Sequence, residues 1–155
     1  MSVSDIRAFV QLAPDIGTSG QPTREQFAAI AADGYEAVIN LALPTSDDAI
    51  ADEGAIVTGL GMAFVNVPVD FKAPNAEELR LFLAIMQGLE GRKKWVHCVA
   101  NLRVSAFCYH YLRYVRGLDE EAARSPLLAK WGPHMTDVWK NFLALPPERR
   151  RSDPA

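Results

Sequence analysis

The first two thirds of the chain alternate between segments with helical spacing of apolar residues and short runs that are apolar throughout. The clearest helical segment begins at Asn75, which has capping-box spacing with Glu78. Its apolar residues recur at i, i+3, i+4 and i+7, and it ends at a glycine: Leu79, Phe82, Leu83, Met86 and Gly91. Short apolar runs are typical of strands buried on both faces of a parallel sheet. We therefore predict helices over residues 22–34, 47–60, 75–91 and 104–115, and strands over residues 35–43, 63–69 and 93–98.

Only helical patterns follow residue 115. Residues 118–131 fit one helix and residues 133–145 another, and one side of the second collects the apolar residues Met135, Val138, Trp139 and Phe142. Strands alternating with helices, followed by helices alone, predict an α/β fold with a central, mostly parallel sheet, flanking helices and extra C-terminal helices. We expect a single domain over residues 1–145 and a charged, solvated tail over residues 146–155.

Composition and charge narrow the range of functions. The chain has 155 residues, 49% of them hydrophobic, which suits one domain with a sizeable core. A net charge of −3 provides no basic field, so we expect no nucleic-acid partner and no membrane surface as a partner. No apolar run approaches the roughly 20 residues of a membrane span, and the first residues lack the apolar stretch of a secretory signal. With only Cys98 and Cys108, a disulfide framework is absent, and we expect a cytoplasmic protein.

The stretch "WVHCVANLRVSAF", residues 95–107, is the strongest candidate for chemistry. Cys98 ends a predicted strand and lies just before a predicted helix, so it is expected at the carboxyl edge of the sheet, where binding sites form. Backbone N–H groups at a helix start have no helical partners and converge on anions. We therefore expect a phosphate-binding loop formed by Val99, Ala100, Asn101, Leu102 and Arg103. The alternative for Cys98 is a buried structural cysteine.

The same environment favours the thiolate, which is the nucleophilic form of cysteine and can attack phosphorus or sulfur. Arg103 supplies positive charge close by, and the ring of His97 is expected to bond the neighbouring backbone and organise the loop. Cys108 falls on the apolar stripe of the following helix and is expected in the core. The three histidines lack metal-ligand spacing and no carboxylate pair accompanies them, so we expect no metal and no other cofactor.

These residues resemble the signature of the cysteine-dependent protein tyrosine and dual-specificity phosphatases. The chain is more closely similar to bacterial phosphatase-like proteins of unknown function, which also have a counterpart of "TSGQPTREQFAAIAADGYEAVINLALP", residues 18–44. The similarity runs from Ala13 to Val115. It implies a protein tyrosine phosphatase-like fold, and it places the loop of Ser19 to Pro22 beside the anion site.

The resemblance also implies a role for each matching residue. Cys98 would form a phosphocysteine intermediate, and Arg103 would clamp the phosphate oxygens through two parallel hydrogen bonds. Ser105 would stabilise the leaving thiolate with its hydroxyl. Asp70, in the loop after "FVNVPV", would protonate the leaving oxygen as a general acid. The substrate would be a phosphorylated small molecule or a phosphoprotein.

The loop departs from the phosphatase pattern C-x-x-G-x-x-R-[ST], because it reads C-V-A-N-L-R-V-S. Asn101 replaces the glycine, and asparagine tolerates left-handed backbone better than other non-glycine residues. Arg103 comes one residue early. The shorter loop also resembles that of rhodanese-type sulfurtransferases, which would form a persulfide on Cys98. Two hypotheses therefore stand beside the phosphatase: a sulfurtransferase, and an oxyanion-binding or regulatory domain with weak or absent catalysis.

Overall fold

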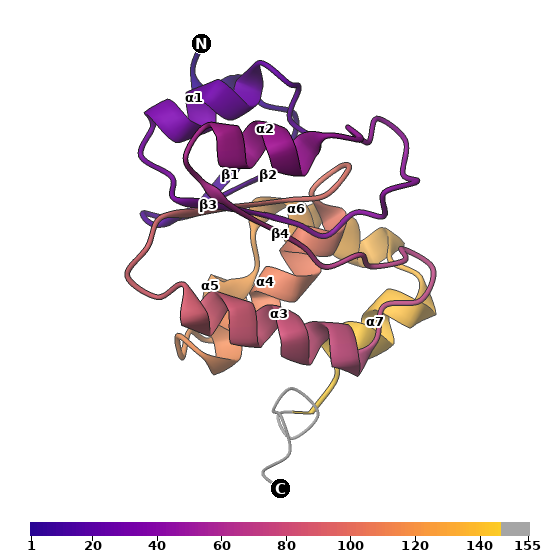
Figure 1. The fold of residues 1–155 in the computed structure, drawn as a ribbon. Coiled ribbons are helices and arrows are strands. Elements are labelled where there is room, and N and C mark those ends of the chain that lie inside the picture. Colours follow the sequence, from indigo (N-terminus) through magenta and orange to yellow (C-terminus); the bar gives the residue numbers. More distant parts are fainter. Residues whose placement is uncertain (147–155) are drawn as a thin grey trace, which may run out of the picture.

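The computed structural model of the protein describes residues 1–146, and its centre is a five-stranded sheet (Figure 1). The strands are β1 (Val10–Ala13), β2 (Ile16–Ser19), β3 (Ala37–Asn40), β4 (Ala63–Asn66) and β5 (Lys94–His97). They lie in the order β1-β2-β5-β3-β4. Only the β1–β2 pair is antiparallel, so the sheet is mostly parallel, as predicted.

The strand register aligns the carboxyl ends of the four parallel strands. Ser19 of β2 lies opposite His97 of β5, His97 lies opposite Asn40 of β3, and Asn40 lies opposite Asn66 of β4. The segments that leave these strands therefore emerge at one edge of the sheet. Cys98 follows His97 directly and lies at the middle of that edge, because β5 is the central strand.

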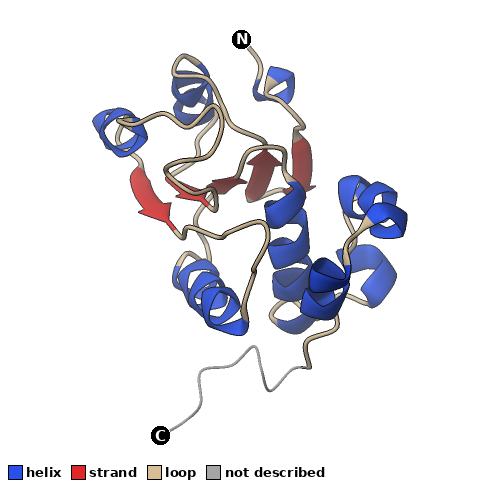
Figure 2. Cartoon of the chain, turned by 90° about the vertical axis from the view of Figure 1, so that its right-hand side faces the viewer, coloured by secondary structure: helices blue, strands red, loops and turns tan. Residues whose placement is uncertain are grey.

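Seven α-helices cover the sheet within the described residues. They are α1 (Gln26–Ala32), α2 (Glu53–Gly59), α3 (Ala76–Gly88), α4 (Leu102–Tyr114), α5 (Glu120–Ala123), α6 (Pro126–Trp131) and α7 (Asp137–Leu143), with short 3₁₀ helices at Val3–Asp5 and Gly132–His134. Helices α1 and α2 cover one face, and α3 to α7 cover the other (Figure 1). Figure 2 shows the sheet between these two helical layers. The fold is the predicted α/β arrangement with extra C-terminal helices.

The alternation of side chains along the strands divides the core between the two layers. Val38 and Trp95 point into the cluster under α1 and α2, whereas their neighbours Ile39 and Val96 point into the larger cluster under α3, α4 and α7. All four residues are completely buried. These strands are apolar on successive positions because both faces of the sheet are covered.

The predicted helix over residues 75–91 is confirmed in detail. Asn75 and Glu78 form the capping box with each other's backbone N–H, at 2.9 and 3.2 Å, and the apolar stripe of α3 is buried. The chain turns at Gly91 with a φ of 81°, which glycine adopts without a steric penalty.

Several predicted helices are shorter or divided, and residues 22–34 form α1 only over Gln26–Ala32. The helix predicted over residues 47–60 occupies only Glu53–Gly59, because residues before it form turns with Asp48 in a left-handed conformation. The helix predicted over residues 118–131 is divided into α5 and α6. Ser125 is extended and caps α6 through its hydroxyl, and Pro126 begins a new helix because it has no N–H to continue the first.

Two further expectations fail at the ends of the chain. The predictions contain no strands before residue 35, yet β1 and β2 form a hairpin that pairs with β5. Val138 is 43% exposed rather than buried with Met135, Trp139 and Phe142, since α7 begins only at Asp137 and Met135 lies outside it. Residues 147–155 of the predicted charged tail lie outside the described residues. Within residues 1–146, no helix is long and apolar enough to span a membrane.

Candidate active site

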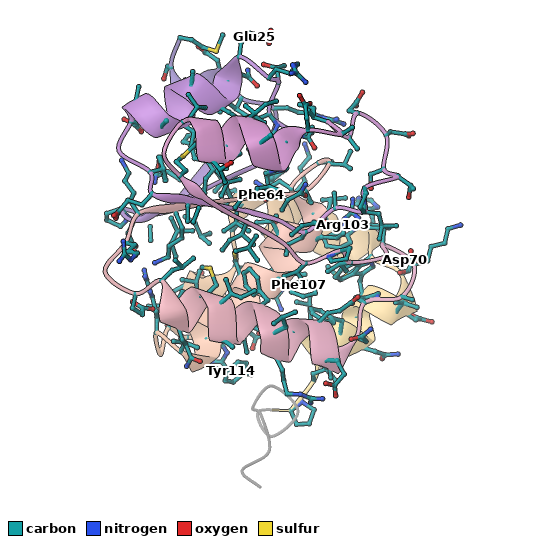
Figure 3. The ribbon with its side chains drawn as sticks, viewed as in Figure 1. Glu25, Phe64, Asp70, Arg103, Phe107 and Tyr114 are labelled. Carbon is teal, nitrogen blue, oxygen red and sulfur yellow. The ribbon has the colours of Figure 1, made fainter. Side chains whose placement is uncertain are left out.

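Cys98 is almost completely buried and lines a cavity of about 630 Å³ at the carboxyl edge of the sheet. Three segments of the chain line the cavity, with the residues Leu43, Thr45, Ser46, Asp47, Asp70, Phe71, Lys72, Cys98, Val99, Ala100, Leu102 and Arg103. Figure 3 shows Arg103 and Asp70 on the same side of the molecule, beside the loop that leads from β4 to α3. The structure therefore brings together the predicted nucleophile, clamp and acid. A second cavity, of about 760 Å³ among the C-terminal helices, contains none of the predicted site residues.

The loop after Cys98 has the backbone of an anion cradle. Asn101 has a φ of 66° and a ψ of 11°, so it turns the loop in the left-handed conformation that its sequence position predicts. Within residues 1–146, no protein acceptor is bonded to the backbone N–H groups from Val99 to Arg103. The last of these belong to the first turn of α4, where the helix dipole adds partial positive charge. The loop therefore carries unpartnered donors next to a thiol.

The side chain of Asn101 holds this turn in place through two hydrogen bonds. Its Nδ2 donates to the carbonyl of Ala8 at 2.8 Å and to Oγ1 of Thr18 at 3.1 Å. Both partners belong to the N-terminal hairpin region, which the sequence did not predict. Asn101 therefore has two roles: it adopts the left-handed conformation, and its side chain connects the cradle to β2 through Thr18.

The segment from Ser19 to Pro22 forms one wall of the cradle, as the resemblance implies. The N–H of Gln21 donates to the carbonyl of Val99 at 2.9 Å. A Cβ added to Gly20 would lie 2.3 Å from the carbonyl oxygen of Val99, so only glycine permits this approach. The backbone of the cradle is thus held from outside by another backbone segment.

Arg103 is 6% exposed and spans the gap between the cradle and the loop after β4. Its Nη1 donates to the carbonyl of Val69 at 2.8 Å, and its guanidinium lies 5.9 Å from the centre of the Phe71 ring. The bond to Val69 uses one of five N–H donors. The edge formed by Nε and Nη2 therefore retains donors for an oxyanion.

Asp70 is exposed and lies between the two residues that Arg103 contacts. Its carboxylate accepts a hydrogen bond from the N–H of Lys72 at 2.9 Å, and its carbonyl accepts one from the N–H of Ala73 at 3.0 Å. These bonds form a compact turn at the cavity wall. Asp70 and Cys98 therefore line the same cavity.

His97 and Glu53 form a buried pair behind the cradle. His97 is fully buried and Glu53 is 3% exposed. Nε2 of His97 lies 2.7 Å from Oε2 of Glu53, while Nδ1 lies 3.2 Å from the carbonyl oxygen of Cys98. Each ring nitrogen of His97 therefore lies within hydrogen-bond distance of an oxygen atom. The predicted contact of His97 with the backbone is confirmed.

Glu53 is the principal site residue that sequence reasoning missed. Besides His97, its carboxylate accepts hydrogen bonds from Gln21 Nε2 at 2.9 Å and from Asn40 Nδ2 at 3.3 Å. A buried carboxylate is costly unless such donors satisfy it. In the sequence, Glu53 resembles any acidic residue that interacts with the helix dipole in the first turn of a helix. Only the alignment of the strand ends brings its side chain together with those of Gln21, Asn40 and His97.

Ser105 and Cys108 lie deeper in α4. The hydroxyl of Ser105 donates to the carbonyl of Asn101 at 2.6 Å and accepts a hydrogen bond from Ser125 at 3.4 Å, and Ser105 does not line the cavity. Its role at the thiolate stays a prediction. Cys108 is buried in the apolar core, as expected, and burial raises the pKa of its thiol well above the ordinary range. Residues 1–146 contain no group of three or more potential metal ligands.

The fold and the cysteine loop define a protein of the cysteine-dependent tyrosine phosphatase superfamily, and solved structures bear this out. A DUF442 protein from Shewanella putrefaciens CN-32, described as a candidate phosphatase, superposes with a TM-score of 0.83 at 35% identity over 92% of each chain. The chain therefore belongs to the DUF442 family.

Other solved structures share the fold at lower identity. Tk-PTP in its active form has a TM-score of 0.71 at 22% identity, covering 92% of this chain and 96% of its own. TpbA of P. aeruginosa has a TM-score of 0.68 at 17% identity, covering 93% and 89%. No protein-family model and no curated protein matches the sequence.

Proposed function

We propose that the protein hydrolyses phosphate monoesters through a phosphocysteine intermediate on Cys98. The observation that carries this proposal is the placement of a thiol at the floor of a cavity between unpartnered backbone N–H groups and a guanidinium. Such donors stabilise the negative charge that develops on equatorial phosphate oxygens, which is usually the largest catalytic contribution. Membership of the DUF442 family supports the assignment.

The reaction has two steps. In the first, the thiolate of Cys98 attacks phosphorus, the bond to the ester oxygen breaks, and Asp70 gives that oxygen a proton. In the second, water attacks phosphorus, Asp70 takes its proton, and the S–P bond breaks to return the thiolate and free phosphate. Arg103 holds two phosphate oxygens throughout.

The proposal also includes the class of substrate, the absence of a cofactor from the reaction, and the cellular location. The substrate is a phosphorylated small molecule or a phosphoprotein, because the cavity beside Cys98 also contains Arg103, which can bind a phosphate group. Neither a cofactor nor a metal takes part in the steps above. Both cysteines are free thiols, which fits a cytoplasmic protein.

One observation favours a rival reaction. Four residues separate Cys98 from Arg103, one fewer than in the phosphatase pattern, and a sulfurtransferase would form a persulfide there. A persulfide reaction needs no general acid, however, and Asp70 on the cavity wall has no role in it. The phosphatase therefore accounts for more of the site.

Hydrolysis of an aryl phosphate separates these functions. We expect turnover by the wild type, inhibition by vanadate, and a loss of about 1,000-fold or more in Cys98→Ser. Cys108→Ala is the matched control, since it alters the other cysteine, which lies outside the cavity, and should retain turnover. Transfer of sulfur from thiosulfate to cyanide, with no Cys98-dependent phosphate release, would establish the rival reaction. Phosphate binding without either activity would leave an oxyanion-binding domain.

A further inference from the structure

The loop that carries Asp70 is attached to a helix outside the cradle. The indole Nε1–H of Trp139, in α7, donates to the carbonyl of Phe71 at 2.8 Å. The ring of Phe71 packs against Trp139 and Trp131, with centroids 5.3 and 5.9 Å apart. The residue after Asp70 is therefore held through both its backbone and its side chain by the C-terminal helices.

The residue before Asp70 is held from the opposite direction. Arg103 donates to the carbonyl of Val69, and the N–H of Val69 donates to the carbonyl of Leu41 at 3.0 Å. Asp70 thus lies between two carbonyl groups, each bonded to a buried side chain of a different helix. The peptide group before Asp70 and the one after Phe71 are both held by these bonds, which restricts where the carboxyl group of Asp70 can point.

Trp139 can hold the loop at Phe71 because its own side chain is buried and packed. It is 1% exposed and packs edge-on against Phe107 and Phe142 in the main core. A buried indole N–H requires an acceptor, and Phe71 provides it. By contrast, Phe71 itself is 38% exposed, so the rigidity of the loop derives from the tryptophan.

We propose that Trp139 is a positioning residue, which holds Asp70 where it can protonate the leaving oxygen, so that helix α7 completes the active site. This inference rests on the proposed function, in which Asp70 is the general acid. It gives the C-terminal helices a part in catalysis beyond covering the core.

The dependence on leaving group tests this role. A general acid matters for a basic alkoxide and little for a weakly basic phenolate that departs without a proton. Trp139→Phe keeps an aromatic ring in the core and removes only the N–H and the second ring. We expect kcat for an alkyl phosphate to fall about tenfold or more, kcat for an activated aryl phosphate to fall less than about threefold, and KM for both to stay unchanged.

Trp131→Phe is the matched control. The Trp131 ring also stacks on Phe71, but the indole that donates to the loop is that of Trp139. In Trp131→Phe, kcat for the alkyl phosphate and kcat for the aryl phosphate should therefore stay near those of the wild type. Phe71→Leu is a second test that does not disturb the core, since Phe71 is partly exposed. It should show a selective loss on the alkyl ester that is smaller than in Trp139→Phe, because the ring contacts are lost but the carbonyl that Trp139 bonds remains. In an Asp70→Asn background, Trp139→Phe should cause no further loss.

The outcomes separate the inference from the proposed function. Equal losses on both esters, or equal effects of Trp139→Phe and Trp131→Phe, would overturn the positioning role while leaving Cys98-dependent hydrolysis intact. An Asp70→Asn variant that hydrolyses the alkyl ester as fast as the wild type would remove the acid and the inference with it. Hydrolysis that survives Cys98→Ser would instead contradict the proposed function.

Discussion

Replacing Gly20 by alanine should impair catalysis although Gly20 itself does not line the cavity. A Cβ at this position would lie 2.3 Å from the carbonyl oxygen of Val99, 3.1 Å from its carbonyl carbon and 3.3 Å from Cα of Ala100. All three are backbone atoms of the cradle, so no side chain can rotate to relieve the overlap. Either the cradle or the segment around Gly20 must move.

The size of this movement sets the expected effect. Ordinary contact begins near 3.4 Å, so the oxygen of Val99 must recede by about 1 Å. A misplacement of about 1 Å at a reacting centre costs roughly 100-fold in rate. We expect kcat/KM for an aryl phosphate to fall by about that factor, and the free energy of unfolding to fall by about 1–3 kcal/mol through overpacking.

Steady-state hydrolysis and urea unfolding of Gly20→Ala, measured beside Gly59→Ala, test this reasoning. Gly59 lies in the last turn of α2 with no heavy atom within 4 Å of an added Cβ. The control should keep full activity and gain up to about 1 kcal/mol of stability from the better helix former. If Gly20→Ala keeps wild-type kcat/KM, the contact between Gly20 and Val99 does not define the cradle.

Two further predictions concern the acidic residues Glu53 and Asp15. Glu53→Gln removes the charge that faces His97. We expect the free energy of unfolding, measured in urea, to fall by about 2–4 kcal/mol and kcat to fall about tenfold. An unchanged urea midpoint would contradict a stabilising role of the pair of Glu53 and His97. Arg116 and Lys94 hold the pKa of Asp15 far below its usual range. Stabilisation by the ionised carboxyl is therefore present above about pH 4 and is lost as pH falls through the lowered value. Between pH 7 and pH 3, the free energy of unfolding measured in urea should fall less for Asp15→Asn than for the wild type. Equal falls in the two proteins would refute this prediction.

The sequence predicts those features that arise from local pattern. The capping box of Asn75 and Glu78 is formed, and Asn101 takes the left-handed conformation expected of a residue in a glycine position. The strand that delivers Cys98 to the carboxyl edge is also found. Each of these depends on a few neighbouring residues, whose spacing or conformational preference is visible in the chain.

Other features depend on contacts between distant segments. The hairpin of β1 and β2 has short strands with little apolar alternation, and its pairing with β5 stabilises it. Glu53 lies 44 residues before His97, and Trp139 lies 68 residues after Phe71. No local pattern marks these pairs, so the buried network and the anchor of the acid loop become apparent only once the sheet aligns its strand ends.

Direct observation of the covalent intermediate tests the central claim. The wild type, turning over an aryl phosphate, is stopped by a rapid denaturing quench, digested, and analysed by mass spectrometry for the peptide that contains Cys98. We predict a phosphate group on the sulfur of Cys98 during turnover, a larger fraction when breakdown is slowed by Asp70→Asn, and none on Cys108. Phosphate release without any adduct on Cys98 would contradict the account, and a persulfide formed from thiosulfate in place of a phosphate adduct would assign the site to sulfur transfer.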